Sequence, residues 1–230
     1  MMSIIKKTFL VTIVLFSVFN ANSQESKFSI GAKAGINFSN VDMELDPDTK
    51  VGYQFGVVAE YNLPKKFFLR SGLDITSKGF KWNLSKIVGD INGDGLLDYA
   101  QAKSSWNAVY LQVPLMLGYK INITNALKIN FALGGYLAHG VGGKVTSKLD
   151  GALGIPAEQF EFFRTEDKDN TFSDDFLLRF DGGLIGSIGA EYRSFTLNVG
   201  YEHGLNNVYQ GAGGSIHNRN IFLAVGYRIF

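Results

Sequence analysis

The feature that most constrains the fold is a strict alternation of residue type over Phe176–Arg193. Apolar residues occupy one set of alternate positions: Phe176, Leu178, Phe180, Leu184, Ile188, Ala190 and Tyr192. Mostly polar residues occupy the other set: Leu177, Arg179, Asp181, Ser187, Glu191 and Arg193. Successive side chains of a strand point to opposite faces, so this segment predicts one apolar wall and one charged wall.

Seven further segments alternate in the same way: 28–39, 51–62, 67–78, 110–119, 127–137, 195–202 and 221–229. Each has about the ten residues that a tilted strand needs to cross a bilayer. The sequence offers no helices to cover the apolar faces, so we expect lipid to cover them. The prediction is an all-β, eight-stranded antiparallel transmembrane β-barrel of the outer-membrane type.

A soluble, lipocalin-like barrel is the alternative, and it would turn its apolar face inward and its polar face to water. Alternation alone does not say which face points inward. The 27 glycines, the mixed charges on the polar face and the tyrosines at strand ends favour lipid on the outside.

The predicted connections are alternately short and long. Short turns are expected at 63–66, 122–125 and 193–194, and long loops at about 40–50, 79–105, 138–174 and 204–217. In outer-membrane barrels the short turns are periplasmic and the long loops extracellular. An even number of strands then places both termini in the periplasm.

The N-terminus has the pattern of a secretory signal peptide. Lys6 and Lys7 precede an apolar run at 9–19, and small residues follow at 21–23. We expect cleavage after Ser23, which leaves one barrel domain at 24–230 and an export route to the outer membrane of a Gram-negative bacterium. The chain has 22 basic and 21 acidic residues, so nothing in its charge supports nucleic-acid binding.

The inward face is predicted to be a filled, nearly neutral interior. Its basic residues would be Lys33, Arg70, Lys78, Arg179, Arg193 and Arg228. Its acidic residues would be Glu60, Asp74, Asp181, Glu191 and Glu202. Eight strands enclose only enough space for side chains, and unpaired buried charge is very costly, so these groups should pair and plug the barrel.

The sharpest local motif is a possible calcium loop at 90–98, which reads D-x-N-x-D-G-x-x-D. The oxygen ligands would be the side chains of Asp90, Asn92, Asp94 and Asp98 and the backbone carbonyl of Leu96. Position twelve is Gln101 rather than a bidentate Glu, so an EF-hand proper is not expected. The same residues also favour an ordinary surface turn, which leaves both interpretations open.

Nothing in the sequence specifies a catalytic site or a cofactor site. His139, His203 and His217 fall at strand ends on the predicted extracellular rim, and His203 and His217 flank one loop. A rim enzyme acting on lipid therefore stays an alternative, although no nucleophile motif accompanies these histidines. The segment 156–164 predicts a short helix over the barrel mouth, and its aromatic residues would either pack against the loop itself or form a contact surface for a partner.

Four segments resemble the PorT-like outer-membrane β-barrel proteins of the Bacteroidota: Tyr110–Tyr119, Arg179–Tyr192, Tyr201–Val208 and the ending at 218–230. The resemblance implies the barrel fold and a role in secretion or envelope assembly. With the pattern above it predicts a non-catalytic outer-membrane protein, embedded in the lipid bilayer, whose loops contact an extracellular or envelope partner. A small-solute porin is the remaining alternative.

Overall fold

The computed structural model describes residues 27–42, 47–89, 98–150, 167–172, 177–209 and 215–229. In these segments the chain forms antiparallel strands and one short 3-10 turn, η1 (Pro64–Lys66). The strands are β1 (Phe28–Asp42), β2 (Asp48–Asn62), β3 (Phe67–Gly89), β4 (Asp98–Asn122), β5 (Leu127–Asp150), β6 (Asp167–Asp169), β7 (Phe180–Tyr192), β8 (Phe195–Gly204) and β9 (His217–Arg228).

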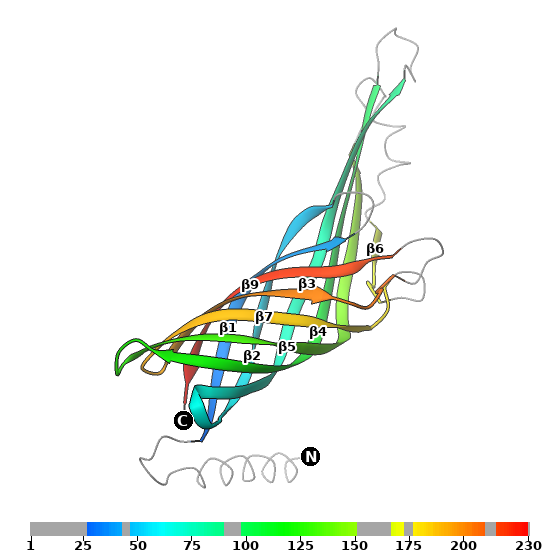
Figure 1. Ribbon diagram of the computed structural model, residues 1–230. Coiled ribbons are helices and arrows are strands. Elements are labelled where there is room, and N and C mark those ends of the chain that lie inside the picture. Colours follow the sequence, from blue (N-terminus) through cyan, green and yellow to red (C-terminus); the bar gives the residue numbers. More distant parts are fainter. Residues whose placement is uncertain are drawn as a thin grey trace, which may run out of the picture.

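Eight of these strands close into a barrel (Figure 1). Neighbours in the chain pair with each other, β5 pairs with β7, and β1 closes the sheet against β9 from Gly31 opposite Arg228 to Asp42 opposite His217. The short β6 lies outside the barrel wall and pairs with β5 over Val145–Ser147. The predicted eight-stranded antiparallel barrel is confirmed.

The barrel has an apolar exterior and a polar interior. Leu115, Leu133 and Leu137 point outward with more than 60% of their surface exposed, whereas inward-pointing Asn37 and Asp181 are completely buried. Exposed apolar surface costs about 25 cal/mol per Å² in water, so a continuous apolar wall requires a bilayer around it. The lipocalin-like alternative has the opposite arrangement and is excluded.

The segment that alternates most strictly supplies β7, with two corrections at its ends. Phe180, Leu184 and Ile188 face outward, and Asp181 and Glu191 face inward, as predicted. Phe176 lies outside the described residues.

Arg179 and Arg193 are exposed instead of lining the interior. Arg179 precedes the strand and donates a hydrogen bond to the carbonyl of Gly140 over 3.0 Å. Arg193 occupies the turn after β7 with a left-handed backbone (φ 53°), which breaks the alternation and turns its side chain over the Tyr192 ring.

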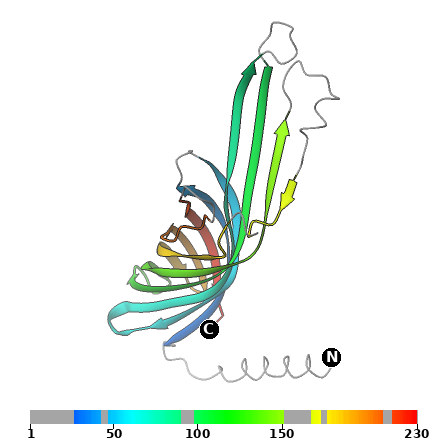
Figure 2. The ribbon, with the colours of Figure 1, turned by 90° about the vertical axis from the view of Figure 1, so that its right-hand side faces the viewer.

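Three neighbouring strands extend far beyond the barrel, and Figure 2 shows them rising together past its rim. β3, β4 and β5 have 23, 25 and 24 residues, against 15 in β1 and in β2. Twenty-five residues span about 80 Å along a strand, and the apolar band of an outer-membrane barrel is only about 25 Å tall. We call the part of these strands beyond the barrel the projecting sheet.

The projecting sheet corrects the prediction of long loops at 79–105 and 138–174, because much of both segments is strand. β3 continues through Gly79, whose φ is 152° and whose missing Cβ would lie 2.0 Å from the carbonyl oxygen of Trp106. This glycine allows the strand to bend and continue, and the pairing register of β2 with β3 shifts just beside it. The glycine-rich part of β5 contains a second shift, opposite Val109 and Tyr110.

The opposite end of the barrel has the predicted short turns, which occupy 63–66, 123–126 and 193–194. The first residue of β1 and the last residue of β9 lie at this same end, which we call the short-turn end. Lys65 and Lys66 both have left-handed backbones there, with φ values of 61° and 67°. Among the described residues, no helix is long and apolar enough to cross a membrane. The predicted signal peptide at 1–23 and the predicted short helix at 156–164 lie outside these residues.

Candidate functional site

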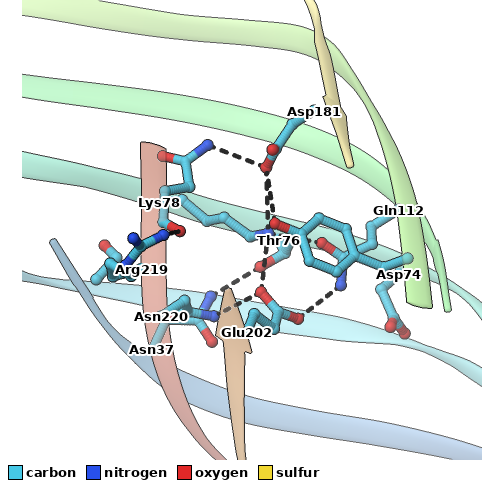
Figure 3. A network of polar contacts seen from close by, with 12 residues as sticks. Asn37, Asp74, Thr76, Lys78, Gln112, Asp181, Glu202, Arg219 and Asn220 are labelled. Atoms are coloured by element: carbon cyan, nitrogen blue, oxygen red, sulfur yellow. Dashed lines mark hydrogen bonds and ion pairs between the residues drawn. The ribbon is translucent and has the colours of Figure 1, made fainter. Parts of the chain in front are cut away.

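The upper part of the lumen, nearer the projecting sheet, is organised around Lys78 of β3 (Figure 3). Its Nζ lies 2.8 Å from Glu202 Oε2 and 3.7 Å from Asp181 Oδ2, and it donates a hydrogen bond to Gln112 Oε1 over 2.8 Å. The ammonium also lies 4.2 Å from the ring centroid of Tyr136. Lys78 is 1% exposed, so two carboxylates and an aromatic face replace its water shell.

The two carboxylates are held by further buried side chains. Glu202 accepts hydrogen bonds from Gln112 over 2.6 Å and from Asn220 over 3.0 Å. Asp181 accepts from Tyr136 over 3.2 Å and from Asn218 over 3.0 Å. These groups come from β4, β5, β7, β8 and β9, so the network joins most of the barrel wall across its centre.

Lys33 and Asp74 complete this upper cluster, with 2.8 Å between Nζ and Oδ2. Next to them Asn37 donates a hydrogen bond to Thr76 over 2.8 Å. Asn37 and Thr76 come from β1 and β3, strands that are not neighbours in the sheet, so the contact reaches across the interior.

A lower cluster fills the lumen toward the short-turn end. Arg70 donates from Nε and Nη2 to Glu60 Oε2 over 3.1 and 3.0 Å. Lys120 lies 3.3 Å from Glu60 Oε1 and 3.1 Å from Glu191 Oε1, and Arg228 also pairs with Glu191. Arg70 and Lys120 both lie within 5 Å of the Phe68 ring centroid, so each cation also has a favourable contact with an aromatic ring.

The predicted plug is confirmed for nine of its eleven charged residues, the exceptions being Arg179 and Arg193. Sequence reasoning missed Lys120, because the alternating segment was ended at Tyr119. Continuing the alternation by one residue would have placed Lys120 on the inward face. Without Arg179 and Arg193 and with Lys120, the two clusters hold five basic and five acidic side chains among the described residues.

The charges balance over the whole lumen but not within each cluster. The upper cluster holds Lys33 and Lys78 against three carboxylates, and the lower cluster holds three cations against two. Asp74 Oδ1 and Asp181 Oδ1 have no hydrogen-bond partner among the described residues, which agrees with an excess of acceptors in the upper cluster. The lumen is therefore negative toward the projecting sheet and positive toward the short-turn end.

The three rim histidines do not form a site in the part of the chain that the structure describes. His139 pairs with Leu111 and with Phe180, both outward-facing, so it belongs to the outer wall. His203 lies opposite Leu184 and Arg219, and its ring contacts Tyr201. Among the described residues no hydrogen bond joins any two histidines, and no three His, Cys, Asp or Glu side chains are arranged to hold a metal.

The predicted calcium motif at 90–98 follows the last residue of β3 in the sequence. Asp90, Asn92, Asp94 and Leu96 lie outside the described residues, while Asp98 begins β4 opposite Gly89 of β3. Calcium binding there stays a prediction.

For Lys78→Met we expect the free energy of unfolding to fall by about 3–5 kcal/mol, because Asp181 and Glu202 would stay buried without their cation. Urea unfolding in detergent micelles measures it. Lys144→Met removes an exposed lysine of β5 and should change stability little. Adding Glu202→Gln to Lys78→Met should recover part of the loss. An unchanged unfolding midpoint in Lys78→Met would show that the upper cluster does not stabilise the barrel.

For the motif at 90–98 we expect added Ca²⁺ to slow proteolysis of the bonds between Gly89 and Asp98. Asp94→Ala removes one ligand and should abolish that protection. Limited proteolysis with and without a chelator, read by mass spectrometry of the fragments, measures it. Identical digestion of the unaltered chain under both conditions would contradict calcium binding.

The chain is similar to several solved structures at low sequence identity. Among solved structures, Ail of Yersinia pestis is 13% identical with a TM-score of 0.38, covering 88% of this chain and 99% of Ail. Neisserial surface protein A is 14% identical with a TM-score of 0.38, covering 88% and 97%. The N-terminal β-barrel domain of Pseudomonas aeruginosa OprF is 10% identical with a TM-score of 0.30, covering 86% and 97%.

No curated protein matches the sequence. The family model described as "Outer membrane protein beta-barrel domain" matches residues 20–210, which is most of the chain. The match agrees with the closed barrel, its apolar exterior and its polar interior. The chain belongs to the outer membrane protein β-barrel domain family.

Proposed function

We propose that this outer-membrane protein is a non-catalytic interaction protein, in which the barrel is a membrane anchor and the projecting sheet contacts a partner outside the cell. The observation that carries the proposal is the contrast between the two parts. The lumen is filled by paired charges, while three strands continue as a sheet well past the membrane (Figure 2). The barrel interior thus offers no path for a solute, whereas the projecting sheet offers a surface for a partner.

One edge of the projecting sheet supports a specific mode of contact. β2 begins at Asp48, opposite Lys81, so β3 from Trp82 to Gly89 pairs with β4 on one side and has no described strand on its other side. An open edge presents unpaired backbone N–H and C=O groups, which an extended segment of another protein can satisfy. The opposite edge of the same sheet already accepts β6 beside β5, so the sheet binds an added strand within its own chain.

The structure favours this role over the small-solute porin. Lys78, Gln112, Asp181 and Glu202 meet near the barrel axis and are almost completely buried, and an eight-stranded barrel has no additional width for a channel. The resemblance to PorT-like proteins suggests secretion or envelope assembly as the process in which the partner takes part.

The rim enzyme receives less support than the interaction role. His203 and His217 face the outer wall, and Asp42, which lies opposite His217, is paired with Arg219 at 2.8 Å. No described acid is therefore positioned to orient either imidazole as a base.

We expect the purified barrel to give no solute flux in a liposome-swelling assay, because its lumen is closed by side chains. A large open porin in the same liposomes is the positive control. Lys78→Ala, which shortens the central side chain, should still give no measurable swelling, since Tyr136 and the lower cluster remain. Swelling by the unaltered chain in small sugars would overturn the anchor role in favour of the porin.

We expect a photo-crosslinking residue at position 83 to give a discrete protein adduct on intact cells, because Asn83 is exposed on β3 beside the open edge. The matched control is position 115, where Leu115 faces lipid and should give no such adduct. Denaturing gels and mass spectrometry of the adduct read the result. If positions 83 and 115 gave the same protein adducts, the result would contradict a partner at this edge.

A further inference from the structure

A cavity of about 750 Å³ opens at the short-turn end of the barrel, far from the projecting sheet. Six basic residues line it: Lys27, Lys65, Lys66, Lys120, Lys128 and Arg228. No carboxylate is among the described residues of its lining. A hollow surrounded by like charges strongly favours an anion, because the cations repel each other until one is bound.

Two of these cations already have carboxylate partners and four do not. Lys120 and Arg228 pair with Glu60 and Glu191 in the lower cluster. Lys27, Lys65, Lys66 and Lys128 form no ion pair with any residue that the structure describes, and the lower cluster beneath them has one excess positive charge. Four cations that have no ion pair among the described residues therefore lie together at this mouth.

The turn that carries Lys65 and Lys66 fixes their positions. Both residues have left-handed backbones in η1, a conformation that glycine or asparagine adopts with less strain. The turn therefore holds two adjacent lysines at the cavity at some cost in stability.

The same cavity has an apolar side that belongs to the bilayer-facing wall. Tyr61 and Phe67 line it and are also exposed on the barrel exterior, at 44% and 42% of their surface. Phe67 packs edge-to-face against Tyr119, with 5.1 Å between ring centroids, in the aromatic girdle near the membrane surface. The cavity therefore lies where the acyl region of a lipid meets its polar head.

We propose that this cavity binds the phosphate head group of an anionic phospholipid from the leaflet at the short-turn end, which is the periplasmic leaflet. The four unpaired lysines hold the phosphate oxygens, and Tyr61 and Phe67 contact the glycerol and upper acyl region. A free anion would use only the basic side of the cavity, whereas a lipid uses both sides. The basic residues thus recognise the phosphate, and the position at the membrane surface selects the lipid form.

The test uses the full mature chain in phosphatidylcholine vesicles that contain a trace of spin-labelled lipid, and electron spin resonance measures the protein-bound fraction. We expect spin-labelled phosphatidylglycerol to associate at least about fivefold more strongly than spin-labelled phosphatidylcholine. In Lys65→Gln/Lys66→Gln/Lys128→Gln the ratio should fall to about one. The control Lys81→Gln/Lys144→Gln removes exposed lysines from β3 and β5 at the other end and should keep the ratio of the unaltered chain.

Three outcomes would overturn the proposal. Equal association of the two lipids with the unaltered chain would show that there is no selective site. An equal fall in the triple variant and in the control would show only a general effect of net charge. Complete displacement of phosphatidylglycerol by inorganic phosphate, but not by sodium chloride of equal ionic strength, would assign the cavity to a free anion instead of a lipid.

Discussion

The free-energy cost of burying a charge determines how the interior of this barrel is arranged. An eight-stranded barrel in a membrane has a polar interior too narrow for bulk water, so each charged side chain that points inward must find an opposite charge within it. Lys78, between Glu202 and Asp181, and Glu191, between Lys120 and Arg228, meet that condition. Because their partners come from strands far apart in the sequence, these contacts also hold the wall of the barrel together.

The sequence predicts the parts of this structure that depend on which face a residue occupies. Alternation places Asp181, Glu191 and Glu202 inside and Leu184 and Ile188 outside, and the structure agrees. Alternation does not give the height of a residue along the barrel axis, so it could not say which charges would meet. The two clusters and their opposite net charges depend on the register between neighbouring strands, which alternation does not specify.

The errors have physical causes that local patterns do not show. Alternation predicts that Arg193 points inward. It points outward because Arg193 lies in the two-residue turn after β7, where its left-handed backbone reverses the direction of the side chain. Gly79 and the glycines of β5 suggested loops, but in this barrel they accompany shifts of register that let long strands bend and continue. The basic cavity is not evident from the sequence because its lysines come from one turn, from the residue before β1 and from the ends of β4 and β5, none of which is basic enough to stand out alone.

The short strand β6 has a consequence for how the protein assembles. By occupying the edge of β5 at Val145–Ser147, it leaves β3 as the long open edge of the described sheet. β6 has only three residues, so its own outer edge offers an incoming strand few backbone groups, whereas β3 offers the longer run from Trp82 to Gly89. A strand added to this sheet therefore pairs along β3 in preference to β6, which directs such contacts to one side of the projecting sheet.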